Sequence, residues 1–119
     1  MATVLIVEDE ILLADCYTRW LVAEGHKIQH VLDAQAAIDA IDEQHPQVIL
    51  LDLLLAGANG IQVLHTLRSH TDIARIPVIL CSSALPQNMP DLAPYGVREV
   101  LDKPTLTRQK LAAAVAGVL

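Results

Sequence analysis

The polar residues of this chain that could do chemistry stand directly after short apolar runs. They are Glu8 and Asp9 after Thr3–Val7, Asp52 after Gln47–Leu51, Ser82 after Pro77–Cys81, and Lys103 shortly after Val97–Leu101. If these runs are parallel strands of one sheet, their carboxyl ends share an edge, and residues far apart in sequence converge there. Each acid alone also fits a plainer role, as a helix cap or an acidic group near a helix N-terminus.

Carboxylates gathered at such an edge would repel one another by about 4 kcal/mol per pair at ~4 Å and an effective dielectric near 20. A hard divalent cation relieves this repulsion, and carboxylates with backbone carbonyl and water oxygens suit Mg²⁺. Lys103 adds a positive charge and Ser82 a hydroxyl donor around Asp52. A carboxylate nucleophile, a metal, a cation and a donor are the parts that phosphoryl transfer requires.

The elements that must position these residues alternate along the chain. The strands are expected at Thr3–Val7, Lys27–Leu32, Gln47–Leu51, Pro77–Cys81 and Val97–Leu101. The helices are expected from about Glu10 to Glu24, from Asp33 as N-cap to Gln44, from Gly60 to Ser69, and from Leu106 to Val118. This alternation predicts an α/β, doubly wound fold with a parallel sheet and helices on both faces.

Two of the helices carry more specific expectations. In the first, Ile11 and Leu12 are counted among the apolar positions, and Gly25 is the expected stop. Between Ser83 and Gly96 the chain has Pro86, Pro90 and Pro94, which are incompatible with a regular helix interior, so a fourth helix should be short or distorted.

The composition bounds the class of protein. The chain has 119 residues, enough for one domain, and 53% hydrophobic residues exclude intrinsic disorder. A net charge of −6 is the wrong sign for direct nucleic-acid binding. No apolar run approaches the ~20 residues of a membrane span. Cys16 and Cys81 have no metal-ligand or disulfide spacing, which favours a reducing cytoplasm, and the scattered histidines are expected to be surface or partly buried residues.

Four motifs together resemble the receiver domains of bacterial response regulators, from Thr3 to about Leu119. They are VLIVEDE at residues 4–10, VILLDLLLAGANG at 48–60, IPVILCSS at 76–83 and DKP at 102–104. The resemblance implies one receiver domain over residues 1–119, with a flavodoxin-like five-stranded sheet of order 2-1-3-4-5. It also implies a cytoplasmic signalling switch of a two-component phosphorelay that assists its own phosphorylation and is not a conventional enzyme.

The resemblance assigns a role to each site residue. Asp52 would accept a phosphoryl group from a sensor histidine kinase or a phosphotransfer protein. Asp9 would bind Mg²⁺ directly, Glu8 through water or as a second ligand, and Leu54 through its backbone carbonyl. Lys103 would pair with the phosphoryl oxygens, and Ser82 would move to hydrogen-bond them. Pro104 matches a family proline that often follows a cis peptide bond.

The chain departs from the family pattern at two positions near the site. Val100 replaces the usual aromatic residue three positions before Lys103, so an aromatic rotamer switch is absent there. Ala56 stands where a proline is common, which loosens the loop after Asp52 without touching the chemistry.

The last predicted helix has almost no polar face over residues 111–119. A helix that is apolar all round is normally buried on more than one side, which predicts packing against a second copy or a following output domain.

Three rival functions are weighed against the switch. An aspartate-nucleophile phosphatase would want a second Asp where the chain has Leu54, and a flavin carrier's phosphate would be repelled by residues 8–10. A receiver whose site is intact but unused, acting by protein contact alone, stays open.

Overall fold

The computed structural model describes residues 2–52, 54–55, 58–59, 64–65, 76–82 and 93–119. Its centre is a sheet of five parallel strands in the order β2-β1-β3-β6-β7. The strands are β1 (Thr3–Val7), β2 (Lys27–Val31), β3 (Val48–Asp52), β6 (Val78–Ser82) and β7 (Val97–Asp102). With the strands of this sheet counted along the chain, the order is 2-1-3-4-5, which confirms the predicted doubly wound fold.

The central strands are buried on both faces because apolar residues occupy both the odd and the even positions of each strand. In β1, Val4 and Ile6 pack into one core while Leu5 and Val7 pack into another on the opposite face. Every residue of β3 and β6 is buried. Such unbroken apolar runs are typical of a parallel sheet covered by helices, and they fix the level at which each strand ends.

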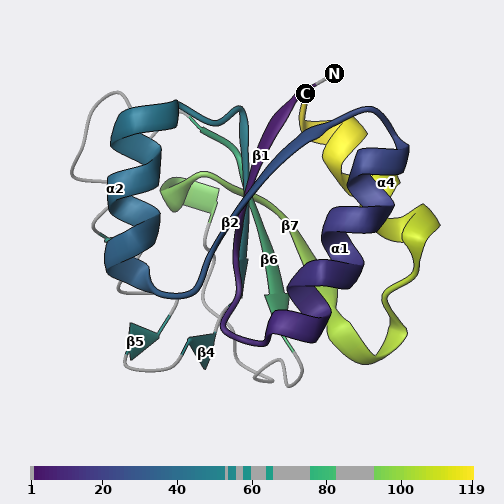
Figure 1. The fold of residues 1–119 in the computed structure, drawn as a ribbon, viewed down its shortest axis with the longest axis horizontal. Coiled ribbons are helices and arrows are strands. Elements are labelled where there is room, and N and C mark those ends of the chain that lie inside the picture. The colour runs from purple at the N-terminus through teal and green to yellow at the C-terminus, as the bar shows by residue number, and fades with distance from the viewer. Residues whose placement is uncertain (1, 53, 56–57, 60–63, 66–75, 83–92) are drawn as a thin grey trace.

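Helices cover both faces of the sheet, as Figure 1 shows. On one side lies α2 (Ala34–Gln44), and on the other lie α1 (Ile11–Ala23) and α4 (Arg108–Val118). Asp33 caps α2 by accepting a hydrogen bond from the Ala36 N–H at 2.8 Å, as predicted. Gly25, the predicted stop after α1, has φ +89, a conformation that glycine adopts without strain.

The structure departs from what was expected for the apolar residues of two helices, α1 and α4. Ile11 and Leu12, in the first turn of α1, are 64% and 82% exposed, and the helix buries Ala14, Tyr17 and Leu21 instead. The closing helix begins at Arg108, with Thr107 as N-cap, and buries Leu111, Ala114 and Val115 on one side only.

Several predicted details fall partly outside the described residues. Of the helix expected over 60–69, Leu64 and His65 are described and are helical. Of the segment 83–96, the described end forms a short 3₁₀ helix at Ala93–Tyr95. The short strands β4 (Leu54–Leu55) and β5 (Ala58–Asn59) pair antiparallel and were not predicted.

Two absences concern only the described part of the chain. None of its helices is long and apolar enough to cross a membrane. It has no cis peptide bond, so the bond between Lys103 and Pro104 is trans.

Candidate functional site

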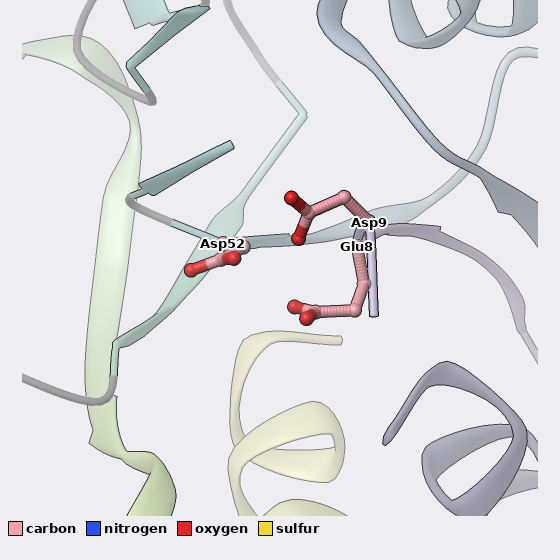
Figure 2. A group of neighbouring side chains, drawn as sticks. All are labelled: Glu8, Asp9 and Asp52. Atoms are coloured by element: carbon pink, nitrogen blue, oxygen red, sulfur yellow. The ribbon is translucent and has the colours of Figure 1, made fainter. Parts of the chain in front are cut away.

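Three carboxylates meet at the carboxyl edge of the sheet. The pairing of Val7 with Leu51 brings β1 and β3 to an end at the same level, so Glu8 and Asp9 emerge beside Asp52. One oxygen from each of the three lies within 4.8 Å of the others. Figure 2 shows the side chains of Glu8 and Asp9 extending from the end of β1 toward Asp52. The convergence expected from the sequence is therefore present.

The three acids differ in their access to solvent. Glu8 and Asp52 are only 2% and 5% exposed, whereas Asp9 is exposed. Asp9 thus forms the open side of the site, and the other two form its floor.

Lys103 directly follows β7, which is separated from β3 by β6, and its side chain extends to the acids. Its Nζ donates to both carboxylate oxygens of Glu8, at 3.0 and 2.9 Å, and lies 3.2 Å from Oδ2 of Asp52. Strands lie about 4.8 Å apart, so only a long side chain can extend from β7 to the end of β3. Lysine provides that reach together with a compact positive charge.

The electrostatics of the site show an excess of negative charge. Burial raises the pKa of Glu8 and the charge of Asp52 raises it further, while the hydrogen bond from Lys103 acts in the opposite direction. Burial lowers the pKa of Lys103, but its contacts with Glu8 and Asp52 outweigh burial and raise it above the usual value. The raised pKa of Lys103 therefore reflects the negative charge of the two carboxylates that it contacts.

Ser82 lies at the end of β6, next to the strand that carries Asp52. Cys81 is in register with Asp52, so Ser82 is the following residue, and it is completely buried. Leu54 belongs to β4, and its role as a carbonyl ligand stays a prediction. Val100 is 38% exposed on β7 and leaves no aromatic ring at that position.

One contact at the site was not anticipated from the sequence. His30, on β2, places Nε2 2.7 Å from the backbone carbonyl oxygen of Glu8. The histidines were expected to be surface or partly buried residues, and no local sequence pattern identifies this contact, because it joins residues 22 positions apart.

The donor set fits a magnesium ion. Carboxylate oxygens are hard ligands, and Mg²⁺ prefers one or two of them together with several waters. Among the four charged side chains, three carboxylates against one ammonium leave a formal charge of −2, which a divalent cation would neutralise. An exposed Asp9 leaves room for the ion's waters or for an incoming phosphoryl group.

Comparisons with known proteins agree with this geometry. The model of the response regulator receiver domain family matches residues 4–116. The transcriptional regulatory protein TcrX of Mycobacterium tuberculosis is 40% identical over 81 residues, which are 68% of this chain and 34% of the relative. The matched part is therefore about a third of that relative's length.

Two solved structures have the same fold. The signal receiver domain of a LuxO repressor protein from Vibrio parahaemolyticus superposes with a TM-score of 0.89 and 31% identity, covering 98% of this chain and 88% of the other. The receiver domain of a sensor histidine kinase of Pseudomonas aeruginosa, solved with a magnesium ion in its active site cleft, gives a TM-score of 0.87. It is 22% identical, over 98% of this chain and 95% of that one.

Proposed function

The chain belongs to the response regulator receiver domain family, and from this premise we propose that it is a switch operated by phosphorylation of Asp52. The donor in this proposal is a phosphohistidine of a sensor histidine kinase or phosphotransfer protein, and residues 1–119 act as one receiver domain. The observation that carries the proposal is the meeting of Glu8, Asp9 and Asp52 within 4.8 Å, with Lys103 bridging two of them.

The proposed reaction is a displacement at phosphorus. An Oδ atom of Asp52 attacks, a P–O bond forms, and the P–N bond to the donor imidazole breaks. The leaving imidazole nitrogen keeps the electron pair and accepts a proton from solvent. The products are an acyl phosphate on Asp52 and a neutral histidine.

The residues around Asp52 have separate tasks in this reaction. Lys103 shifts its contact from the Asp52 carboxylate to the phosphoryl oxygens, so that the negative charge on them stays paired. The Ser82 hydroxyl donates to another of these oxygens. Bound Mg²⁺, held by Asp9, Asp52 and the Leu54 carbonyl with Glu8 through water or as a second ligand, supplies charge neutralisation to the transferred group. The magnesium reported for the Pseudomonas aeruginosa receiver domain supports this assignment.

The proposal is tested by incubating the chain with acetyl phosphate and Mg²⁺ and measuring its intact mass. We expect the mass to rise by one phosphoryl group, and we expect no rise for Asp52→Asn. Asp42→Asn is the matched control, because Asp42 is an exposed aspartate on α2, outside the site, and it should be phosphorylated like wild type. No adduct on wild type, or an adduct that survives in Asp52→Asn, would favour regulation by protein contact alone.

The C-terminal helix carries the second part of the proposal. Ala113, Ala116 and Gly117 are exposed on α4, on the side turned away from the core. We propose that this face contacts a second copy of the chain or a following output domain. Light scattering of wild type and of Ala113→Arg, with and without acetyl phosphate, tests self-association. A strict monomer at high concentration in every condition would exclude the second copy.

A further inference from the structure

We propose that His30 is a positioning residue that orients the turn between β1 and α1, and through it the metal ligand Asp9. The inference rests on the proposed function and adds to it a residue outside the acidic cluster. Its basis is the contact of 2.7 Å between His30 Nε2 and the carbonyl oxygen of Glu8.

The contact fixes the direction of the hydrogen bond. A carbonyl oxygen only accepts, so Nε2 must carry the hydrogen and donate it. The length is at the short end of the range for N–H···O bonds, and His30 is half-buried, so water competes with the bond only in part.

Both backbone polar groups of Glu8 are held by β2. The Glu8 N–H donates to the carbonyl oxygen of Val31 at 3.1 Å, which extends the strand pairing by one residue. The Glu8 carbonyl oxygen accepts from the side chain of His30 on the same strand. β2 therefore holds Glu8 in place at the point where the chain leaves β1 and approaches α1.

Peptide geometry transmits this constraint to Asp9. The Glu8 carbonyl, the Asp9 N–H and the Asp9 Cα lie in one rigid plane, because the peptide bond does not rotate freely. Fixing the carbonyl direction therefore fixes where the Asp9 Cα lies. Asp9 has more need of such support than its neighbours, because it is exposed while Glu8 and Asp52 are buried.

The N-cap residue of α1 is also connected to Glu8 by a hydrogen bond. Glu10 is the N-cap of α1 and makes no hydrogen bond from its side chain to the helix. The Glu10 N–H instead donates to Oε1 of Glu8 at 3.3 Å. Glu10 is thus held by Glu8 as well as by the Ala14 N–H, which donates to the Glu10 carbonyl oxygen at 3.0 Å, and His30 is one of the groups that hold Glu8.

The test measures Mg²⁺ affinity of the unphosphorylated chain by calorimetry at fixed pH. His30→Leu removes the donor, and we expect the dissociation constant to rise about tenfold, the usual effect of losing a group that orients a ligand. His30→Gln keeps an N–H donor of similar reach and should bind within about threefold of wild type. His26→Leu is the matched control, since His26 accepts from the Ala2 N–H at the far end of β2 and should leave affinity unchanged.

The outcomes separate this inference from the proposed function. If wild type binds Mg²⁺ and His30→Leu binds it equally well, or if the Leu and Gln variants are equally weakened, the positioning role is wrong and the switch stands. If wild type binds no Mg²⁺, both fail. Nitrogen NMR of the histidine side chains tests the inference on the wild-type protein and does not depend on the folding of a variant. We expect Nε2 of His30 to carry a hydrogen. An Nε2 without a hydrogen would overturn the inference.

Discussion

The ion pairs at the ends of the central strands are far less exposed to solvent than the ion pair in the helical layer formed by α1 and α4. At the ends of β1 and β3, buried carboxylates contact a buried ammonium at 2.9–3.2 Å. In the helical layer, the ion pair between Arg108 and Glu24 is about half exposed and 3.5 Å long. Charges withdrawn from water are costly unless they are paired, so the pairing at the strand ends matters more for stability than the exposed pair in the helical layer.

The helical layer offers a different feature, an open groove between β7 and α4. It encloses about 520 Å³ and is lined in part by Arg98, Glu99, Lys110 and the small residues Ala113 and Gly117. Small side chains and separated charges suit contact with another surface. The proposed phosphorylation site and the proposed contact surface therefore lie on different elements of one domain.

The largest contrast is expected between the two thiols. Cys81 is buried beside Asp52, and burial raises its pKa to about 12, whereas Cys16 is half-buried on α1. Since only the thiolate reacts, alkylation of Cys81 at pH 8 should be at least about a hundredfold slower than that of Cys16. Peptide mapping after timed iodoacetamide treatment measures both rates. Equal rates would show that the strand ends open readily to solvent.

The two ion pairs should differ next in their effect on stability. Lys103→Met leaves the buried Glu8 carboxylate without its cation and should lower the free energy of unfolding by about 3 kcal/mol. Arg108→Met removes the exposed pair and should change it by about 0.5 kcal/mol or less. Urea denaturation without Mg²⁺ measures both. A similar small loss for the two variants would erase the distinction between the regions.

Magnesium should stabilise the strand ends in a pH-dependent way. A ligand at a hundred times its dissociation constant adds about 2.7 kcal/mol to the free energy of unfolding. Protonation of Glu8 weakens Mg²⁺ binding, and its raised pKa means that this loss begins above the pH expected for an ordinary glutamate. Because the pKa of Glu8 is higher in the folded protein, protonation of Glu8 stabilises the metal-free fold. This stabilisation is fully present below the ordinary glutamate pKa of 4.5 and is lost as the pH rises through the higher pKa of the folded state. Because Mg²⁺ binds the ionised form of Glu8 better, the stability that Mg²⁺ adds shrinks as the pH falls.

Melting temperatures with and without Mg²⁺ between pH 5 and 8 measure this dependence. The difference should decrease toward pH 5 in wild type and vary less in Glu8→Gln. A constant difference in wild type across this range would contradict the electrostatic description of the site.

The smallest effect is expected at Gly117 in the groove. A Cβ added there would meet nothing within 4 Å, and alanine favours the helix. Gly117→Ala should therefore raise the free energy of unfolding by about 0.5 kcal/mol, a value reduced by its place near the end of α4, and should leave phosphorylation by acetyl phosphate unchanged. A destabilised variant would mean that the groove is tighter than the structure shows.

The sequence predicted the sheet well because its strands are short aliphatic runs between amphipathic segments. A polar residue at the end of such a run, Asp52 for example, has to lie at the carboxyl edge of the sheet. The match to the receiver family then supplied the strand order and the roles of the acids, which spacing alone could not supply.

Two kinds of feature could not be predicted from the sequence. Ile11 and Leu12 were counted among the apolar positions of the first helix, but both are exposed in its first turn and the burial begins at Ala14. The meeting of Lys103 with the acids was predicted, but its double hydrogen bond to Glu8 and the contact of His30 with the Glu8 carbonyl depend on side-chain reach across strands. That reach follows from tertiary structure and leaves no mark in the local pattern.

The central claim is that the acids of β1 and β3 hold a divalent cation beside a phosphoryl group on Asp52. Crystals grown with Mn²⁺ and a beryllofluoride mimic test it most directly through the anomalous signal of manganese. We predict one strong peak within bonding distance of Asp9 and Asp52, with the mimic joined to Asp52 and in contact with Lys103. An ordered mimic with no manganese peak at these carboxylates, or a mimic bound elsewhere, would contradict it.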